Sequence, residues 1–316
     1  MSNLKAGIIG CGRMGRERAR CITALGAHVA AVFDVDPLRM QELARSYNSK
    51  AAASVEECLS TDLDALFVCT APGTRGQAEE NALHRGLPLF VEKPIGISLN
   101  SCQGILRLLE SKHGINAVGY MNRYRQSIQV VRELLQDREI IGLSGHWVCK
   151  RYNVPWWSDS AASGGPHNEQ ATHLFDLFRY LGGEITQVQS MFYEASRTAT
   201  VTRFQTGTVG TLFYSCDGSE KDIGLRIFTS RGSLTLSGWD FSLTENSVDG
   251  QVVLSADEDI FRKETDAFLN AVRSGRPGLI ESDFPDAART QAVVDAARQS
   301  SQLAQGMDVR ELEPVL

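Results

Sequence analysis

The sequence predicts an α/β protein with two domains: a doubly wound parallel sheet, then an α+β domain built on a large, mostly antiparallel sheet. The chain has 316 residues, and a single hydrophobic core usually stops growing before that size. In residues 4–122, short apolar strands alternate with helical patterns, as in a parallel sheet covered by helices. After about residue 140, β-rich segments follow one another, which indicates antiparallel pairing. We place the domains at residues 1–121 and 122–316.

Five strands are expected in the first domain, with the sequences KAGIIG, VAAVFD, ALFVCT, PLFVEK and AVGYMN. Each is a nearly continuous apolar run, as expected for strands that are buried on both faces. Amphipathic helical periodicity is clear between them, for example in residues 13–25 and 98–113. We therefore expect helices on both faces of this sheet.

The second domain begins with the predicted strand IGLSGHWVCK, followed by a helix that contains His173. Further strands are expected in ITQVQSMFYEAS, TATVTRFQTG, TVGTLFYSCDG, IGLRIFTSRG and SLTLSGW. The last stretch is helical again, in FRKETDAFLNAVRSG and in residues 284–305. We expect these closing helices to pack back on the first domain.

Composition and charge narrow the class of protein. The apolar fraction is 42%, the charged fraction is 22% and the net charge is −6, which is ordinary for a globular protein and offers no basic surface for nucleic acid. No apolar run has the length of a membrane span, and the first residues lack the apolar core of a signal peptide. The seven cysteines are scattered without a CxxC pair. We expect a cytoplasmic protein with reduced thiols and no nucleic-acid or membrane partner.

A dinucleotide-binding pattern follows the first strand. Gly10, Gly12 and Gly15 form GxGxxG between a predicted strand and a predicted helix, where glycines let the backbone approach a pyrophosphate at the helix N-terminus. Asp34 lies 19 residues beyond Gly15, where a carboxylate binds ribose hydroxyls and repels a 2′-phosphate. The pattern favours NAD, and Arg39 leaves NADP open. The alternative is a glycine-rich turn that binds no ligand.

A second chemical signal lies at the carboxyl end of the fourth strand, in VEKPIG. Ligands bind at this edge of an open α/β sheet, and Lys93 is unusual there because lysine prefers open solvent. Pro94 restricts Lys93 to an extended backbone, and the peptide bond between them is either cis or trans. Lys93 either acts on a ligand or pairs with a nearby carboxylate. Beyond the glycines and Asp34, cofactor contacts are expected from Arg13, Met14, Arg39, Thr70, Pro72, Glu92 and Lys93.

Polar side chains gather at the start of a helix in GGPHNEQATHLFD. Glu169 and His173 are four residues apart, so they share a face of an α-helix, and an apolar stripe that begins at Leu174 anchors the helix. The pair is either a buried structural contact or the reacting end of a site. His167 and His173 are six apart, on different helix faces, and HNEQATH is not HExxH, so we expect no metal site.

Three more side chains are candidates for substrate contact. Trp156 and Trp157 lie in a predicted loop before this helix, and either could stack on a sugar ring, although tryptophan more often packs in a core. Arg123 lies at the end of the fifth strand. It could bind an anionic group of the substrate or form an ion pair between the domains.

Together, GIIGCGRMG, VEKPIG, GYMNRY and GGPHNEQATHLFDLFRYLGGE resemble the glucose-fructose oxidoreductase/inositol dehydrogenase family, Gfo/Idh/MocA, and the resemblance runs the full length of the chain. It implies a Rossmann domain, a C-terminal α/β domain, and hydride transfer between NAD or NADP and a secondary alcohol or ketone of a sugar, cyclitol or related polyol. The family's catalytic lysine and histidine fall on Lys93 and His173. The resemblance also implies a homo-oligomer, a dimer or a tetramer.

The sequence departs from the family pattern near these residues. Glu169 replaces the usual aspartate, and Gly73 and Gly76 stand where many members have Asn and His. Gln170 and Thr172 add polarity and are expected, with Glu169, to contact the substrate.

The chemistry leaves alternatives open. In oxidation, either a neutral His173 or a desolvated Lys93 could accept the hydroxyl proton, and Glu169 would orient His173 or bind a neighbouring hydroxyl. A dinucleotide-binding regulator without turnover and an NAD-dependent glycosidase are the alternative functions.

Overall fold

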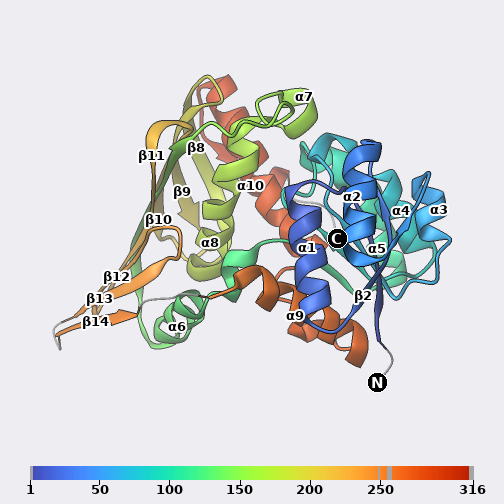
Figure 1. Ribbon diagram of the computed structural model, residues 1–316. Helices are drawn as coiled ribbons and strands as arrows, with labels where there is room; N and C mark the ends of the chain where they lie inside the picture. Colours follow the sequence, from blue (N-terminus) through green and yellow to red (C-terminus); the bar gives the residue numbers. More distant parts are fainter. Residues whose placement is uncertain (1–2, 248–249, 255–257, 313–316) are drawn as a thin grey trace.

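The computed structural model describes residues 3–247, 250–254 and 258–312, which build two sheets with helices between and around them (Figure 1). The first sheet is parallel, with the strand order β3-β2-β1-β4-β5-β6. From β1 the sheet is built outward to β3 on one side, and from β4 it is built outward to β6 on the other side. The order of the strands therefore switches between β1 and β4, and ligands bind at such a switch point in open α/β sheets. The strands are β1 (Lys5–Ile9), β2 (His28–Phe33), β3 (Lys50–Ala51), β4 (Ala65–Val68), β5 (Leu89–Val91) and β6 (Asn116–Val118).

Both faces of this sheet are buried, as its apolar strands predict. In β4, Leu66 enters one core cluster and Phe67 enters another, because alternate side chains point to opposite faces. The predicted helix at residues 98–113 begins with a 3-10 turn, η2, before it becomes α-helical as α5. The helices of this half are α1 (Arg13–Ala24), α2 (Pro37–Tyr47), α3 (Val55–Leu59), α4 (Gln77–His84) and α5 (Gln103–Lys112), with 3-10 segments η1 (Pro72–Thr74), η2 (Leu99–Cys102) and η3 (Met121–Tyr124).

The second sheet has the order β14-β13-β12-β11-β7-β10-β9-β8-β15. β10 pairs with β7 in parallel, and the other pairs are antiparallel, which confirms the predicted, mostly antiparallel sheet. Its strands are β7 (Ile140–Lys150), β8 (Ile185–Tyr193), β9 (Arg197–Phe204), β10 (Val209–Ser215), β11 (Asp217–Thr229), β12 (Gly232–Ser237), β13 (Ser242–Ser247), β14 (Gly250–Leu254) and β15 (Met307–Asp308).

One face of this second sheet is covered and the other is open. Exposed and buried residues alternate strictly along β9, and Figure 1 shows helices on the side that faces the rest of the molecule. The helices of this half are α6 (Gln126–Leu134), α7 (Ser160–Ser163), α8 (Thr172–Gly182), α9 (Ile260–Ser274) and α10 (Phe284–Leu303), with a π-helical segment η5 (His167–Ala171) and 3-10 segments η4 (Leu135–Asp137), η6 (Pro277–Leu279) and η7 (Val309–Glu311).

The C-terminal helices return to the first sheet. α9 lies beside α1 (Figure 1), and its Phe268 packs edge-on against Phe67 and Phe90, with ring centroids 5.2 and 5.5 Å apart. α10 contacts β8 and α8 of the second half and also β6 and η2 of the first. The two halves therefore share packed elements beside the switch point.

Two further expectations concern thiols and membranes. All seven cysteines lie within the described residues and are free. Among the described residues, no helix combines the length and apolarity that crossing a bilayer requires.

Candidate active site

The glycine loop after β1 has the shape of a pyrophosphate cradle. Gly10 has φ +96°, and a Cβ there would lie 2.7 Å from the carbonyl carbon of Cys69. A Cβ on Gly15 would collide with the carbonyl oxygen of Gly10, whereas one on Gly12 would meet nothing within 4 Å. Two glycines are thus needed for the turn and its packing, and the third borders open space. This is the arrangement that a dinucleotide-binding loop requires, and Arg13 and Met14 follow it in the first turn of α1.

Asp34 braces this loop. Its carboxylate accepts hydrogen bonds from the backbone N–H of Cys11 at 2.6 Å and of Asp36 at 2.8 Å. Each oxygen keeps a second lone pair, so a ribose hydroxyl contact stays a prediction. Arg39 is 57% exposed and pairs with Asp36, 3.1 Å from its carboxylate.

Glu92, expected among the cofactor contacts, has a structural role. It is 5% exposed, and its carboxylate accepts a hydrogen bond of 2.7 Å from the Nε of Arg18. Arg18 is fully buried and also bonds the carboxylate of Glu264 at 2.5 Å. The Glu92 side chain therefore joins β5 to α1 and α9, and its contact with the cofactor stays a prediction.

Arg75, which the sequence analysis missed, ties together the two loops beside the site. Its Nη2 donates to the carbonyl of Thr70 at 2.8 Å, and its Nη1 donates to the carbonyls of Glu92 and Pro94. The hydroxyl of Thr70 is buried with no partner in the described structure, and Pro72 is buried at the start of η1. The departures at Gly73 and Gly76 were noted in the sequence, but nothing there indicated that the arginine between them reaches back.

Lys93 meets the helix start that carries Glu169. The Lys93–Pro94 bond is cis, and the ammonium donates to the carbonyl of Glu169 at 2.7 Å and lies 3.4 Å from its carboxylate. The Lys93 side chain is 14% exposed and that of Glu169 is 7% exposed. The structure shows the pairing of Lys93 with a carboxylate, and an action of Lys93 on a ligand stays a prediction.

The segment that precedes His173 is a π-helix, His167–Ala171, which continues as α8. Such segments are rare and occur often at functional sites. Glu169 and His173 therefore do not have simple α-helical spacing, and within the described residues no hydrogen bond joins them. The expectation that Glu169 orients His173 is replaced by its contact with Lys93.

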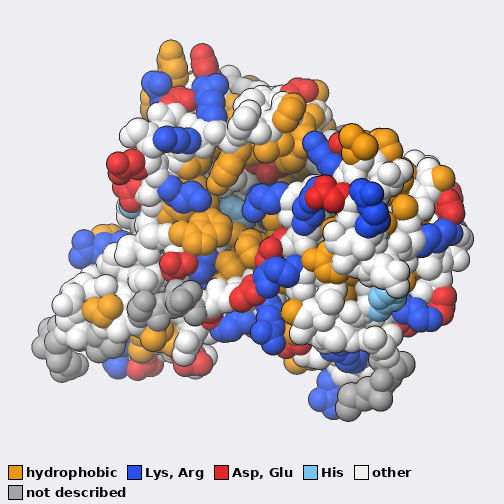
Figure 2. Space-filling model, viewed as in Figure 1, with side chains coloured by type: hydrophobic (Ala, Val, Ile, Leu, Met, Phe, Trp, Pro, Cys, Tyr) orange, Lys and Arg blue, Asp and Glu red, His pale blue; other side chains and the backbone are white. Residues whose placement is uncertain are grey.

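His173 lies against aromatic side chains. Its ring stacks on Trp147, with centroids 5.2 Å apart and planes 13° apart, and meets Tyr120 edge-on at 6.4 Å. Its Nδ1 is buried without a partner among the described residues. Figure 2 shows a hollow between the two halves of the molecule, bordered by apolar, lysine or arginine, and histidine side chains.

Burial sets the protonation of the two central groups. Burial, then the charges of Lys93, Arg125 and Arg13, lowers the pKa of His173 well below its usual value, so the imidazole is neutral at physiological pH. Burial also raises the pKa of Glu169, and the charge of Lys93 opposes this rise.

The other polar residues of the helix start differ in their surroundings. Thr172 is fully buried and its hydroxyl is 2.7 Å from the hydroxyl of Tyr120, and its contact with substrate stays a prediction. Gln170 is 7% exposed, and its side-chain oxygen is buried with no partner in the described part of the chain. Gln170 stays a candidate for substrate contact.

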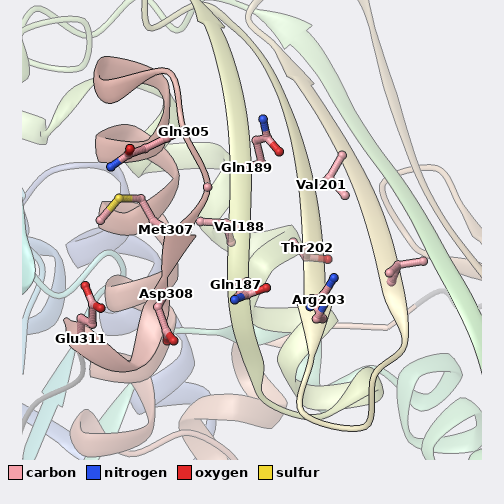
Figure 3. A pocket seen from close by; sticks show the side chains of 12 residues that line it. Gln187, Val188, Gln189, Val201, Thr202, Arg203, Gln305, Met307, Asp308 and Glu311 are labelled. Atoms are coloured by element: carbon pink, nitrogen blue, oxygen red, sulfur yellow. The ribbon is translucent and has the colours of Figure 1, made fainter.

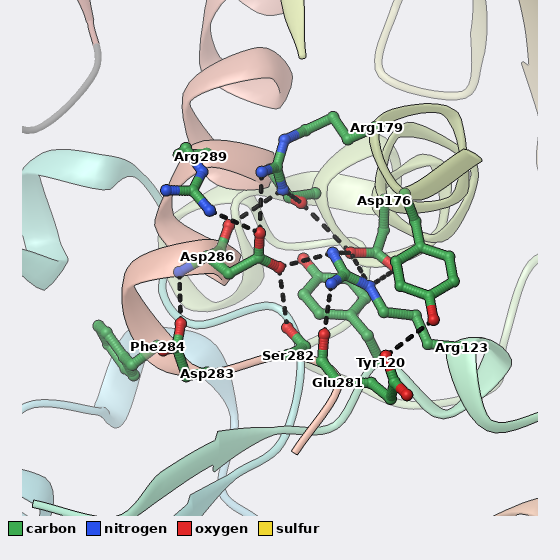
Figure 4. A network of polar contacts seen from close by, with 12 residues as sticks. Tyr120, Arg123, Asp176, Arg179, Glu281, Ser282, Asp283, Phe284, Asp286 and Arg289 are labelled. Atoms are coloured by element: carbon green, nitrogen blue, oxygen red, sulfur yellow. Dashed lines mark hydrogen bonds and ion pairs between the residues drawn. The ribbon is translucent and has the colours of Figure 1, made fainter. Parts of the chain in front are cut away.

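Arg123 belongs to a buried ion-pair network (Figure 4). Its Nη2 lies 2.6 Å from the carboxylates of both Asp176 and Asp286, and its Nη1 donates to the carbonyl of Glu281 at 2.6 Å. Arg179 shares Asp286, at 3.0 Å. These partners all lie in residues 122–316, so the network is internal to the second half. Arg123 is 3% exposed and already has these partners, and its contact with an anionic group of the substrate stays a prediction.

The two tryptophans separate. Trp157 is 2% exposed and packs in the main core, with its ring edge-on to Tyr152 at 5.3 Å. This burial favours the core packing that the sequence analysis gave as the alternative, and a contact of Trp157 with substrate stays a prediction. Trp156 is partly buried against the same core, and its contact with substrate remains a prediction.

Two protein-family models match the chain. A model described as an oxidoreductase family with an NAD-binding Rossmann fold matches residues 4–120, and a GFO/IDH/MocA C-terminal domain model matches residues 128–235. The fold and the glycine loop thus match the class of oxidoreductases that have an NAD-binding Rossmann fold. Within that class, the chain belongs to the Gfo/Idh/MocA oxidoreductase family, and the prediction of an NAD-binding family is confirmed.

Named relatives match part of the chain. An inositol 2-dehydrogenase of Rhizobium meliloti (strain 1021) is 25% identical over 183 residues, 57% of this chain and 56% of that protein. A UDP-N-acetylglucosamine 3-dehydrogenase of Acidithiobacillus ferrooxidans is 28% identical over 133 residues, 42% of each chain. The chain therefore spans about half the length of the curated relatives it matches.

The fold is shared over nearly the whole chain. A levoglucosan dehydrogenase solved in complex with NADH and L-sorbose superposes with a TM-score of 0.87 at 17% identity, over 98% of this chain and 99% of that one. At this identity, the likeness concerns the fold alone.

Proposed function

We propose that the chain is an NAD-dependent dehydrogenase or reductase that acts on a secondary alcohol or ketone of a sugar, cyclitol or related polyol. The observation that carries the proposal is the contact of Lys93 with Glu169, four residues before a neutral, buried His173. A lysine and a neutral imidazole beside a dinucleotide cradle are the groups that alcohol oxidation needs. The names of the relatives support this class of substrate.

The glycine loop, with Gly12 bordering open space, would hold the pyrophosphate of NAD, and Asp34 would face its ribose. When bound, NAD supplies the hydride acceptor. His173 accepts the proton of the substrate hydroxyl, because burial keeps its imidazole neutral. Lys93 donates a hydrogen bond to the same oxygen and stabilises its developing negative charge. Glu169 positions the ammonium of Lys93 through its backbone carbonyl and its carboxylate.

We also propose the wider context expected from the sequence. The domains divide between residues 121 and 122, the protein acts in the cytoplasm, and it forms a homo-oligomer through the open face of the second sheet. Exposed apolar side chains on that face support self-association, among them Met191, Val201 and Phe213, which are 78%, 52% and 45% exposed.

Nicotinamide absorbance during turnover tests the function. Purified protein is screened with NAD⁺ and NADP⁺ against cyclitols, aldoses and sugar derivatives, together with Lys93→Met and His173→Asn. We expect turnover with NAD⁺ that falls by about 10²–10⁴-fold in each variant, while calorimetry shows cofactor binding within a few-fold of the parent. Full turnover in both variants would overturn the assignment of these residues.

A further inference from the structure

Positive charge surrounds His173. The charged groups that act on its pKa are Lys93, Arg125 and Arg13, and all three are cationic. Lys93 already has a carboxylate partner in Glu169, and Arg13 lies at the glycine loop, where a pyrophosphate would take up its charge. Arg125 is the cation of this set that neither Glu169 nor the proposed cofactor compensates.

Arg125 is deeply buried and incompletely bonded. It is 1% exposed, its Nε donates to the side-chain oxygen of Asn122 at 2.9 Å, and its Nη1 donates to the carbonyl of Asp240 at 3.4 Å. The Asp240 carboxylate is 3.9 Å away and 57% exposed, so it is a weak partner. The Nη2 of Arg125 and the Nδ2 of Asn122 are buried donors with no partner within the described residues.

Such donors are rare in folded proteins, because each costs free energy unless a partner fills it. Here the two orphaned groups belong to side chains that are bonded to each other. A guanidinium and an amide N–H side by side suit the oxygens of a carboxylate or a phosphate. Burial lowers the pKa of Arg125 to about 10, and the charges of Asp240 and Glu258 only partly oppose this fall, so the guanidinium stays charged at neutral pH.

Aromatic rings connect this guanidinium to the reacting histidine. Trp147 stacks on His173 at 5.2 Å and meets Trp239 edge-on at 6.4 Å. The guanidinium carbon of Arg125 lies 5.6 Å from the Trp239 ring, and the ammonium of Lys221 lies 4.5 Å from it. Trp239 is 38% exposed. The contacts among His173, Trp147 and Trp239 therefore extend from the buried histidine to the surface, and the two cations lie against Trp239.

We propose that the substrate is a sugar or polyol that carries an anionic group, a carboxylate or a phosphate, and that Arg125 binds this group while the reacting alcohol lies at Lys93 and His173. The inference rests on the proposed function and adds the substrate specificity of the same site. Arg125 is here a residue that determines specificity, and Asn122 positions it.

Matched substrate pairs test the proposal. The holoprotein is assayed with hexoses, the corresponding hexuronates and the corresponding hexose phosphates, as parent, Arg125→Gln and Arg138→Gln. Arg138 is the matched control, because it is a partly buried arginine whose Nε has no partner among the described residues and whose carboxylate partner, Glu245, lies on β13. Thermal unfolding of each variant checks that it folds.

We expect the parent to favour one anionic series over the neutral hexose by about 10- to 100-fold in kcat/KM, as charge-assisted hydrogen bonds allow. Arg125→Gln should abolish this preference, so that its kcat/KM for the anionic substrate falls to that for the hexose, whereas Arg138→Gln should keep it. Comparison of the hexuronates with the hexose phosphates identifies which anionic group the protein recognises. A parent that prefers the hexose, or an Arg125→Gln that slows both members of a pair equally, overturns the proposal.

A binding assay separates this inference from the proposed function. If the panel gives no turnover, tryptophan fluorescence is titrated with hexuronate and hexose phosphate in the presence of NADH. Saturable quenching in the parent and in Arg138→Gln, lost in Arg125→Gln, supports the anion site even without catalysis. Equal responses in all three proteins, or none in the parent, refute it.

Discussion

Hydrogen bonds to backbone carbonyl groups position Lys93 as much as its ion pair with Glu169 does. Its ammonium bonds the carbonyl of Glu169, and Arg75 bonds the carbonyls of Glu92 and Pro94 on either side of Lys93. The sequence motif singles out Lys93, and the polar helix start singles out Glu169 and His173, as candidates, although the i to i+4 spacing does not hold in the π-helical segment. The motifs do not identify Arg75 or Arg125, since the contacts of both depend on the path of loops between elements.

The role of Arg75 is open to a direct test. Arg75→Lys keeps the charge but replaces the planar fork, whose two terminal nitrogens reach these carbonyls, with a single ammonium. We therefore expect a loss of about 1–3 kcal/mol in the free energy of unfolding and a fall in kcat as Lys93 loses its fixed position. Chemical denaturation and steady-state kinetics measure both. Arg85→Lys is the control, because Arg85 bonds the carbonyl of Leu59 at 2.6 Å, outside this loop. Unchanged kcat in Arg75→Lys would contradict the argument.

At the scale of elements, the hydrophobic periodicity of the sequence predicts the strands and sheets better than it predicts features that depend on tertiary contacts. The apolar runs of the first half correctly indicate a buried parallel sheet, and alternation indicates the half-exposed second sheet. The π-helical segment His167–Ala171 could not be predicted, because its register depends on packing rather than on a residue pattern. The edge strands β14 and β15 were likewise missed, since they are short and have weak alternation.

The junction of α1 and α9 depends on one buried cation. Arg18→Met would leave the carboxylates of Glu92 and Glu264 buried without their partner, and removing one member of a buried ion pair costs about 3–5 kcal/mol. Arg20→Met is the matched control on the same helix, because the Arg20 side chain is 46% exposed in its pairs with Glu17 and Asp259, and it should cost about 1 kcal/mol or less. Urea denaturation compares them; equal losses would show that Arg18 is not essential to the junction.

For the molecule as a whole, buried histidines make stability depend on pH. Burial, assisted by the charge of Arg298, lowers the pKa of His167 to about 3. The unfolded chain takes up a proton at this residue below about pH 6.5, whereas the folded chain does not. The contribution of His167 to stability is therefore lost as the pH falls, by on the order of 1 kcal/mol per pH unit.

His167→Phe tests the predicted direction of this pH dependence. Phenylalanine suits the position, because His167 already packs among Phe175, Phe192 and Tyr214. We expect the stability of the variant relative to the parent to improve steadily from pH 7 to pH 5, by about 1.4 kcal/mol per unit once the unfolded histidine is charged. Denaturation at several pH values provides the measurement. A difference that does not change with pH would show that His167 titrates alike in both states.

The open sheet face makes a prediction about assembly. Figure 3 shows a groove lined by β8, β9 and the β15 edge, with Gln187, Gln189, Val201 and Arg203 among its residues. Val201→Glu should reduce the sedimenting mass toward the 34.7 kDa of one chain, because a charge would be buried in the interface. Leu38→Glu, at a site that is 76% exposed on α2, should leave assembly unchanged. A parent that sediments as a single chain rules out this interface.

Transfer of deuterium tests the central claim most directly. Once the screen identifies a substrate, it is labelled at the carbon that bears the reacting hydroxyl, and the nicotinamide product is analysed by mass spectrometry. The account predicts one deuterium in the reduced nicotinamide with the parent protein, and a yield at least about 100-fold lower with Lys93→Met and His173→Asn. Unlabelled reduced nicotinamide, or equal label with all three proteins, would contradict hydride transfer at the Lys93 and His173 site.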